Sequence, residues 1–259
     1  MSKLSIISKR DVIPSTTYQG PRTVSGVISS HRLTPEGYAL WMCESDLADG
    51  AEIFWDEEHG EDIIYVIEGE VEIENRVCPT DGAVVVEGGV KTILKSIGRS
   101  RVVHFGSRSN DEPSGIFGSP ERLGRGVHVV GPGGTIQSGE AEGVHAVWYA
   151  DSTCRTCRCQ LLQVTAPPRE NDKGKPHSHS EDEIIYLLEG RISMGAYELE
   201  KGSALCVPGN VRYSLVGGAE GHRFINFRRD VCEQIYERNS EPLLETGLAR
   251  GGRLINDLR

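Results

Sequence analysis

The chain has 259 residues, of which 37% are hydrophobic and 25% are charged, with 31 glycines and a formal net charge of −10. This length suits one large domain or two of ordinary size, and the composition is that of a turn-rich globular protein. The acidic balance argues against partners that carry negative charge, so we expect no binding to nucleic acid or to an anionic membrane.

Residues 1–17 carry several basic side chains but no apolar stretch long enough for a secretory signal, and no later run approaches the length of a membrane span. The seven cysteines are an odd number, which fits free thiols in a reducing compartment better than a disulfide framework. We therefore expect a cytoplasmic protein.

Short runs rich in valine, isoleucine and aromatic residues follow, each bounded by glycine, aspartate or asparagine. Such runs predict strands and tight turns. In the first half they lie at 52–57, 62–69, 82–89 and 100–107.

The pattern is duplicated along the chain. EDIIYVIEGEVEI at 61–73 matches DEIIYLLEGRISM at 182–194, so the offset from 61 to 182 is 121 residues, and a second pair follows at 81–94 and 201–215. The repeat predicts two small antiparallel β-barrels or sandwiches. The polar stretch 107–126 has the composition of a connector, so we place the division near residue 118, between a unit at 1–118 and a unit at 119–259.

Three closely spaced cysteines, Cys154, Cys157 and Cys159, lie in the second unit. Their spacing starts like a zinc knuckle, but structural zinc takes four ligands and the sequence has no second CxxC. We therefore expect free thiols.

The most informative stretch is PHSHSEDEIIYLLEG at 176–190. Alternate residues of a strand share a face, so His177 and His179 point the same way, and Glu183 has the same parity. A tight turn at 180–182 would bring the three side chains together inside a barrel. Two imidazoles and one carboxylate are typical of non-haem iron sites, and manganese, nickel and zinc also accept them. The alternative is an exposed hairpin with a surface ion pair.

The same stretch resembles the first motif of the cupin family, and GSALCVPGNVRYSL at 202–215 resembles the second. The resemblance covers both halves through the repeat and implies a bicupin: two antiparallel β-barrels, one divalent transition metal per chain and a homodimer. Cupins include dioxygenases, decarboxylases, isomerases, lyases and non-catalytic binding proteins. The matching residues are His177, His179, Glu183 and Gly190 in the first motif, and Gly202, Pro208 and Gly209 in the second.

Tyr213 stands where the second cupin motif supplies a further histidine. As a phenolate it would be a metal ligand, and as a phenol it would be a proton donor or, once ionised, a base. Simple packing at the barrel mouth is the third possibility. We include Tyr213 among the metal ligands, with His177, His179 and Glu183, and name Tyr213 and Glu183 as the catalytic residues.

The N-terminal unit lacks the histidines. Aligning Asp62 with Glu183 places Asp56 and Glu58 where His177 and His179 stand. We expect this half to have no transition-metal site, although three carboxylates could hold calcium or magnesium if they clustered.

Two further expectations concern the end of the chain. Of the arginines at 212, 223, 228 and 229, most should be solvated on the outer face, although a guanidinium could bind a substrate carboxylate. Residues 230–239 and 240–250 have helical spacing, with Ser240 as N-cap and Gly251 beyond the last turn, which predicts short helices. The expected fold is all-β, with two tandem barrels and short terminal helices.

The sequence supports three functions. The favoured one is a non-haem iron dioxygenase in which Fe(II) binds a small polar or anionic, oxygen-bearing substrate. The second is a metal-dependent isomerase or lyase that uses Tyr213 for proton transfer. The third is a non-catalytic binding protein for a small molecule.

Overall fold

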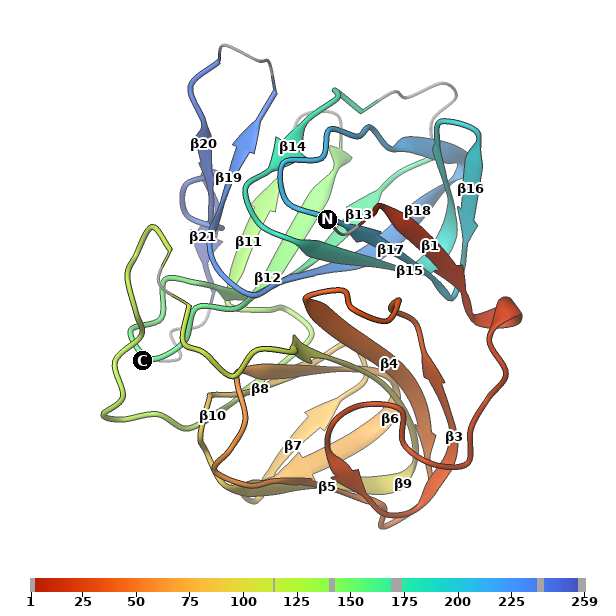
Figure 1. Ribbon diagram of the computed structural model, residues 1–259, viewed down its shortest axis with the longest axis vertical. Coiled ribbons are helices and arrows are strands. Elements are labelled where there is room, and N and C mark those ends of the chain that lie inside the picture. Colours follow the sequence, from red (N-terminus) through yellow and green to blue (C-terminus); the bar gives the residue numbers. More distant parts are fainter. Residues whose placement is uncertain (1–2, 114, 140–142, 169–173, 237–239, 256–259) are drawn as a thin grey trace.

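The computed structural model describes residues 3–113, 115–139, 143–168, 174–236 and 240–255. Two antiparallel β-sheets, each curled around its own core, lie one above the other (Figure 1). Within the described residues there is no α-helix and no helix that could span a membrane; a 3-10 turn lies at Lys9–Asp11.

The N-terminal sheet has the strand order β10-β8-β6-β9-β4-β3, with β5 and β7 paired to β9 and β6 and with β2 paired to β5. Its strands are β2 (Thr23–Val24), β3 (Val27–Arg32), β4 (Leu40–Leu47), β5 (Glu52–Trp55), β6 (Asp62–Ile73), β7 (Arg76–Pro79), β8 (Ala83–Val86), β9 (Thr92–Ser107) and β10 (Val127–Val130).

The C-terminal sheet has the strand order β1-β17-β15-β18-β13-β12-β11-β21, with β16 paired to β15. Its strands are β1 (Ser5–Ser8), β11 (Ile136–Gly139), β12 (His145–Asp151), β13 (Gln160–Ala166), β15 (Glu183–Met194), β16 (Tyr197–Glu200), β17 (Ser203–Val207), β18 (Val216–Arg228) and β21 (Arg253–Leu254). The all-β fold predicted from the repeat is confirmed.

The two halves exchange strands. β1, from the start of the chain, pairs with β17 of the C-terminal sheet, and β10, which follows the connector, pairs with β8 of the N-terminal sheet. Figure 1 shows β1 lying in the upper body, away from the strands that follow it in sequence. The division near residue 118 stays a prediction, because chain order and sheet membership differ at these two strands.

The expected terminal helices are wrong. Where they were predicted, the chain forms β19 (Cys232–Ile235) and β20 (Leu243–Glu245), which join β14 (Ser178–His179) in a small third sheet. Residues 237–239 lie outside the described part of the chain, while Ser240 precedes β20 rather than a helix. Cys232, Gln234 and Glu245 are buried by this sheet, so tertiary burial has overridden the local helical spacing.

A glycine shared by the two repeats bends the central strand of each sheet. Gly69 in β6 and Gly190 in β15 have φ of 80° and 75°, and register shifts flank both positions. A Cβ on Gly190 would lie 2.0 Å from the backbone oxygen of Gly221. Only glycine fits there without strain. The glycine that both repeats share therefore marks a β-bulge, at which each strand bends.

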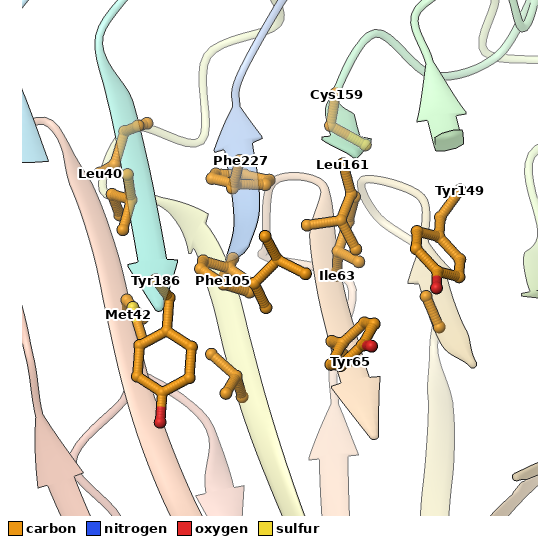
Figure 2. Packing of buried hydrophobic residues seen from close by; sticks show 14 of the residues in the cluster. Leu40, Met42, Ile63, Tyr65, Phe105, Tyr149, Cys159, Leu161, Tyr186 and Phe227 are labelled. Carbon is orange, nitrogen blue, oxygen red and sulfur yellow. The ribbon is translucent and has the colours of Figure 1, made fainter. Parts of the chain in front are cut away.

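One hydrophobic cluster joins the two barrels (Figure 2). Phe105 of β9 stacks on Phe227 of β18 with ring centroids 5.4 Å apart, and Tyr65 meets Tyr149 edge-on at 5.6 Å. Such pairs add about 0.5–1.5 kcal/mol beyond the burial of their area. The halves therefore form one packed unit.

The interface repeats the pseudo-symmetry of the sequence. Tyr65 and Tyr186 hold the same place in the two repeats, and each reaches across to the other barrel, Tyr65 to Gln163 at 2.7 Å and Tyr186 to Glu44 at 2.5 Å. Because side chains alternate along a strand, the neighbours of each interface residue on β6 and β15 face the interior of their own barrel. Glu183, one residue before the interface residue Ile184, thereby points into the C-terminal barrel.

Glu61 makes the junction between the halves sensitive to pH. Its carboxylate accepts the backbone N–H groups of Arg158 (2.9 Å) and Cys159 (2.7 Å), yet desolvation raises its pKa to about 7. The folded protein thus holds this proton more tightly than the unfolded chain, so its contribution to stability is full below about pH 4.5 and is lost as the pH rises through about 7.

We expect Glu61→Gln to reduce the fall in melting temperature of the wild type between about pH 4.5 and 7. Thermal unfolding at a series of pH values measures this, with the exposed Glu57→Gln as the control. Equal slopes in the wild type and Glu61→Gln would show that Glu61 does not titrate in this range.

Candidate metal centre

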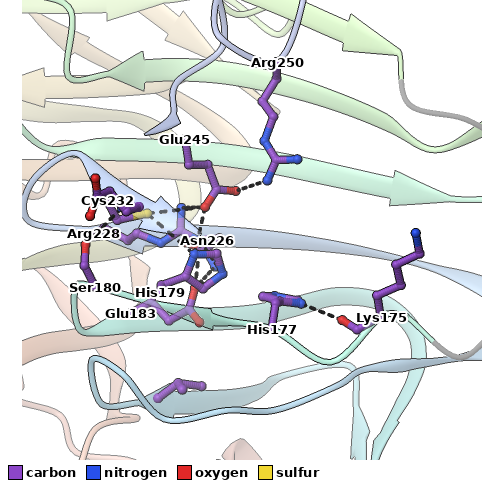
Figure 3. Close-up of polar contacts among 12 residues, drawn as sticks. Lys175, His177, His179, Ser180, Glu183, Asn226, Arg228, Cys232, Glu245 and Arg250 are labelled. Carbon is purple, nitrogen blue, oxygen red and sulfur yellow. Dashed lines mark hydrogen bonds and ion pairs between the residues drawn. The ribbon is translucent and has the colours of Figure 1, made fainter. Parts of the chain in front are cut away.

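The interior of the C-terminal barrel collects most of the polar side chains that the sequence singled out (Figure 3). β14 carries His179, and β15 begins with Glu183, after a turn in which Asp182 accepts the N–H of Gly209 at 2.7 Å. His177 and Tyr213 face one another through a pair of backbone hydrogen bonds of 3.0 and 2.9 Å. The predicted tight turn therefore places the four residues around one end of the barrel.

Both histidines are held through Nδ1. His177 Nδ1 donates to the backbone oxygen of Lys175 at 2.8 Å, and His179 Nδ1 lies 2.9 Å from Glu245 Oε2. A carbonyl oxygen can only accept, so the neutral His177 ring carries its proton on Nδ1 and keeps a lone pair on Nε2. Burial lowers the pKa of His177, which favours this neutral form. The arrangement is that of metal-binding histidines, whose other nitrogen is fixed by a carbonyl or carboxylate.

Glu183 is completely buried and faces His179, with Oε2 3.9 Å from His179 Nε2. Burial alone would raise the pKa of Glu183, but His179 and Arg228 lower it on balance, so the carboxylate is ionised. Its Oε2 accepts from Asn226 at 2.7 Å, while Oε1 makes no hydrogen bond with the described residues. An unpartnered buried carboxylate oxygen is a suitable place for a cation.

His177 and Tyr213 stand beside this pair without completing it. The His177 ring centroid is 4.9 Å from that of His179 and 4.8 Å from that of Tyr213. Among the described residues, however, the donor atoms of His177, His179 and Glu183 do not all lie within 4.8 Å of one another. In Figure 3 the His177 ring is turned toward Lys175. The four predicted ligands thus lie next to one another, and His179 and Glu183 direct donor atoms toward each other.

Tyr213 is a phenol in this environment rather than a phenolate. Burial raises its pKa well above the ordinary value, and the negative charge of Glu183 raises it further. A protonated phenol is a poor metal ligand but a competent hydrogen-bond and proton donor. Of the alternatives for Tyr213, the electrostatics favour the proton donor.

Arg228 is the main surprise of the site. The expectation of a solvated arginine is wrong here, because the side chain is 2% exposed and lies inside the barrel. Its Nη2 is 2.8 Å from Glu183 Oε2 and 3.3 Å from His179 Nε2, so the guanidinium contacts both side chains that would bind an ion. Asn226 and Arg228 oppose Ile185 and Glu183 on the neighbouring strand, which sends both into the barrel.

Glu245 and Cys232, from the third sheet, complete the cluster. Arg228 Nη1 lies 3.3 Å from Glu245 Oε2, and the Cys232 thiol donates to the same oxygen at 3.3 Å. His179, Cys232 and Glu245 place donor atoms within 4.8 Å of one another and are themselves a group that could hold a metal ion. Burial raises the pKa of Cys232 well above the ordinary value, so its sulfur serves here as a hydrogen-bond donor.

The donor set fits a divalent cation in part. His179 and Glu183 already face one another. The two buried carboxylates, Glu183 and Glu245, are both paired with Arg228, and Glu245 Oε1 also lies 3.5 Å from Arg250 Nη2. The two arginines balance the two carboxylates, so a divalent ion at His179 and Glu183 would have to compete for charge that the protein already neutralises. Arg228 is its competitor, since it contacts both side chains.

In the described part of the N-terminal barrel, no comparable set of ligands comes together around Asp62. Asp62, the counterpart of Glu183, is saturated by protein donors: Arg22 Nε at 2.6 Å, Arg22 Nη2 at 3.1 Å and Trp55 Nε1 at 2.7 Å. Asp56 and Glu58 are exposed instead of joining it. Among the described residues the three carboxylates therefore do not form a group, which gives no support to the alternative of a calcium or magnesium site.

No family model matches the sequence, and no curated protein matches it. Solved structures do. The oxalate decarboxylase of Lactobacillus farciminis in complex with formate has a TM-score of 0.67 at 13% identity, covering 91% of this chain and 89% of that chain. Protein Ylba from E. coli, of family model DUF861, gives 0.64 at 11% identity, with 87% and 90% covered.

A structure of the oxalate decarboxylase of Bacillus subtilis, from work on its Mn(II) centres, has a TM-score of 0.59 at 16% identity, covering 89% of this chain and 78% of that chain. At such identities the likeness concerns the fold. The chain has the two-barrel fold of the bicupin oxalate decarboxylases over most of its length.

Proposed function

We propose that the protein is a metal-dependent bicupin enzyme whose C-terminal barrel acts on a small anionic, oxygen-bearing substrate by proton transfer, as a lyase or isomerase. The observation that carries this proposal is Tyr213, a buried phenol whose pKa is raised by burial and by Glu183, beside His177 and His179. The similar solved structures support a metal-dependent enzyme, since two of those named above are oxalate decarboxylases and one of these has Mn(II) centres.

The anionic substrate is inferred from Arg228. Its Nε and Nη1 make no hydrogen bond with the described residues, although Nη1 is near Glu245. Leaving a buried donor unsatisfied costs about 1–3 kcal/mol. A substrate carboxylate or enolate oxygen would remove this cost and use the planar geometry of the guanidinium.

His177, His179 and Glu183 would hold the divalent ion, which when bound would act as a Lewis acid toward a substrate oxygen. Tyr213 then supplies a proton from its hydroxyl to the substrate atom that becomes basic when a bond to carbon breaks. Arg228 lowers the cost of the resulting phenolate, since its charge opposes the effect of Glu183 on the Tyr213 pKa. Asn226 keeps Glu183 in place through its hydrogen bond to Oε2.

The metal test uses protein reconstituted anaerobically with Mn(II) or Fe(II), freed of excess ion and assayed by elemental analysis. We expect about one added equivalent per chain, lost in His179→Ala because this change removes a poised ligand and its support by Glu245. The exposed His145→Ala is the matched control and should retain the ion. Equal uptake of Mn(II) or Fe(II) by His179→Ala would exclude the barrel site.

The reaction class is tested on the reconstituted protein with a panel of oxalate, 2-oxo acids, 2-hydroxy acids, catechols and 1,3-diketones. Product formation without oxygen consumption, at equal rates under air and argon, is the expected result. Oxygen uptake in proportion to product would replace the proposal with a dioxygenase. Tight binding without turnover of any compound would favour a binding protein.

A further inference from the structure

A second group of metal-ligating side chains meets outside the barrels, where the two halves join. It comprises Glu87 just after β8, His128 in β10 and Cys154 in the loop between β12 and β13. One donor atom from each lies within 4.8 Å of the others. The site is separate from the C-terminal barrel and does not depend on the function proposed for it.

The distances approach those of a tetrahedral zinc site. His128 Nε2 is 2.7 Å from Glu87 Oε1, and Cys154 Sγ is 3.7 Å from the same oxygen. Around zinc, with bonds of 2.0–2.3 Å, neighbouring ligand atoms are roughly 3.3–3.8 Å apart. An ion placed among the three donors would replace the hydrogen bond between His128 and Glu87 and move these two ligand atoms apart by roughly 0.6–1.1 Å.

Cys157 is the candidate for a fourth donor, although its sulfur does not lie within 4.8 Å of all three other donor atoms. It follows Cys154 in a CxxC arrangement and is 3% exposed. The neighbouring Cys157 and His128 lower the pKa of Cys154 below the ordinary value, which favours its release of a proton to a metal ion. Thiolates and imidazole together select zinc over magnesium or calcium.

The carboxylate of Glu87 is fixed as a ligand would be. The side chain is fully buried, Oε2 accepts the backbone N–H of Gly126 at 2.8 Å, and Oε1 accepts the hydroxyl of Thr156 at 2.6 Å. Cys154 and Glu87 also raise the pKa of His128 to about 9, which reports a strongly negative local potential. Partners that orient a ligating carboxylate are the usual surroundings of a built metal site.

We infer that Glu87, His128, Cys154 and Cys157 bind one zinc ion, which fastens the loop between β12 and β13 to the N-terminal sheet. All four ligands are protein side chains, so the site is closed and structural rather than catalytic. Sequence reasoning found the cysteines but set zinc aside for want of two more ligands. Those ligands come from Glu87 and His128, far away in the chain.

The test is elemental analysis of the full-length protein, purified under reducing conditions, loaded with zinc and freed of excess ion. Beyond any zinc held in the barrel, we expect about one equivalent that is lost in Cys154→Ser and in His128→Gln and kept in His179→Ala, which removes the barrel site. Cys206→Ser, a buried thiol elsewhere, is the matched control. Cobalt(II) in place of zinc should give thiolate-to-metal absorption bands in the wild type but not in Cys154→Ser.

Two results would overturn the inference. One is zinc uptake that disappears in His179→Ala and persists in Cys154→Ser, which would assign the ion to the barrel. The other is a wild type that takes up no zinc and whose mass, without reductant, shows a disulfide between Cys154 and Cys157, which would make the pair a redox dithiol. If Cys154→Ser fails to fold, His128→Gln and the cobalt spectrum of the wild type still decide.

Discussion

Replacing Arg228 with methionine is expected to lower the free energy of unfolding of the metal-free protein by about 3–5 kcal/mol. The guanidinium is 2% exposed and neutralises Glu183 and Glu245 inside the barrel at 2.8 and 3.3 Å. Methionine keeps much of the volume but leaves two buried carboxylates with Arg250 as a distant partner at 3.5 Å. Urea denaturation of chelator-treated protein measures the change.

Arg155→Met is the control, because its ion pair with Glu121 is largely exposed and such pairs contribute about 0–1 kcal/mol. The same variant tests the competition at the metal site. Without Arg228, a divalent ion meets no guanidinium at His179 Nε2 and Glu183 Oε2, so Mn(II) should restore more stability to Arg228→Met than it adds to the wild type. A metal-free Arg228→Met as stable as the wild type would mean that Glu183 or Glu245 is protonated in the barrel.

The sequence predicted the parts of this protein that depend on local periodicity. The repeat at 61–73 and 182–194 gave the two barrels, and alternation along the strand placed Glu183 on an inner face. The shared glycine falls at the bulge, where a positive φ and a close backbone contact demand it. Each of these follows from residues that are neighbours in sequence.

The parts that depend on distant contacts were not predictable in this way. Glu245 lies in a segment with helical spacing, and only its pairing with β19 makes it a strand that reaches His179. Arg228 was expected to be solvated because charged side chains usually are. The alternation along FINFR at 224–228 nevertheless places Asn226 and Arg228 on the same inward face of the strand. Glu87 and His128 join Cys154 only because β10 crosses to the N-terminal sheet.

The interior of the C-terminal barrel also explains why two motifs alone do not define its chemistry. His179 and Glu183 match the predicted ligand pattern, yet Arg228 brings a permanent positive charge to the same side chains. A bound ion and the guanidinium must therefore share the negative charge of Glu183 and Glu245. This competition predicts weaker metal binding than the two histidines alone would suggest, with Arg228 available to an anionic substrate.

Tyr213→Phe is expected to lower kcat by about 10²–10⁴-fold on the substrate found with the panel, while the metal content stays at that of the wild type. The phenylalanine keeps the packing of a residue that is 7% exposed but removes the one proton that its hydroxyl can give. Steady-state kinetics and elemental analysis on the same samples measure both quantities. Tyr197→Phe, at an exposed tyrosine, is the control.

The two readouts separate the roles left open for Tyr213. A phenolate ligand would be lost with the hydroxyl, so the metal content of Tyr213→Phe would fall together with kcat. A packing residue would leave both unchanged. A proton donor alone gives low kcat with full metal content, and because burial and Glu183 hold the pKa of Tyr213 well above its ordinary value, the phenol stays protonated at neutral pH.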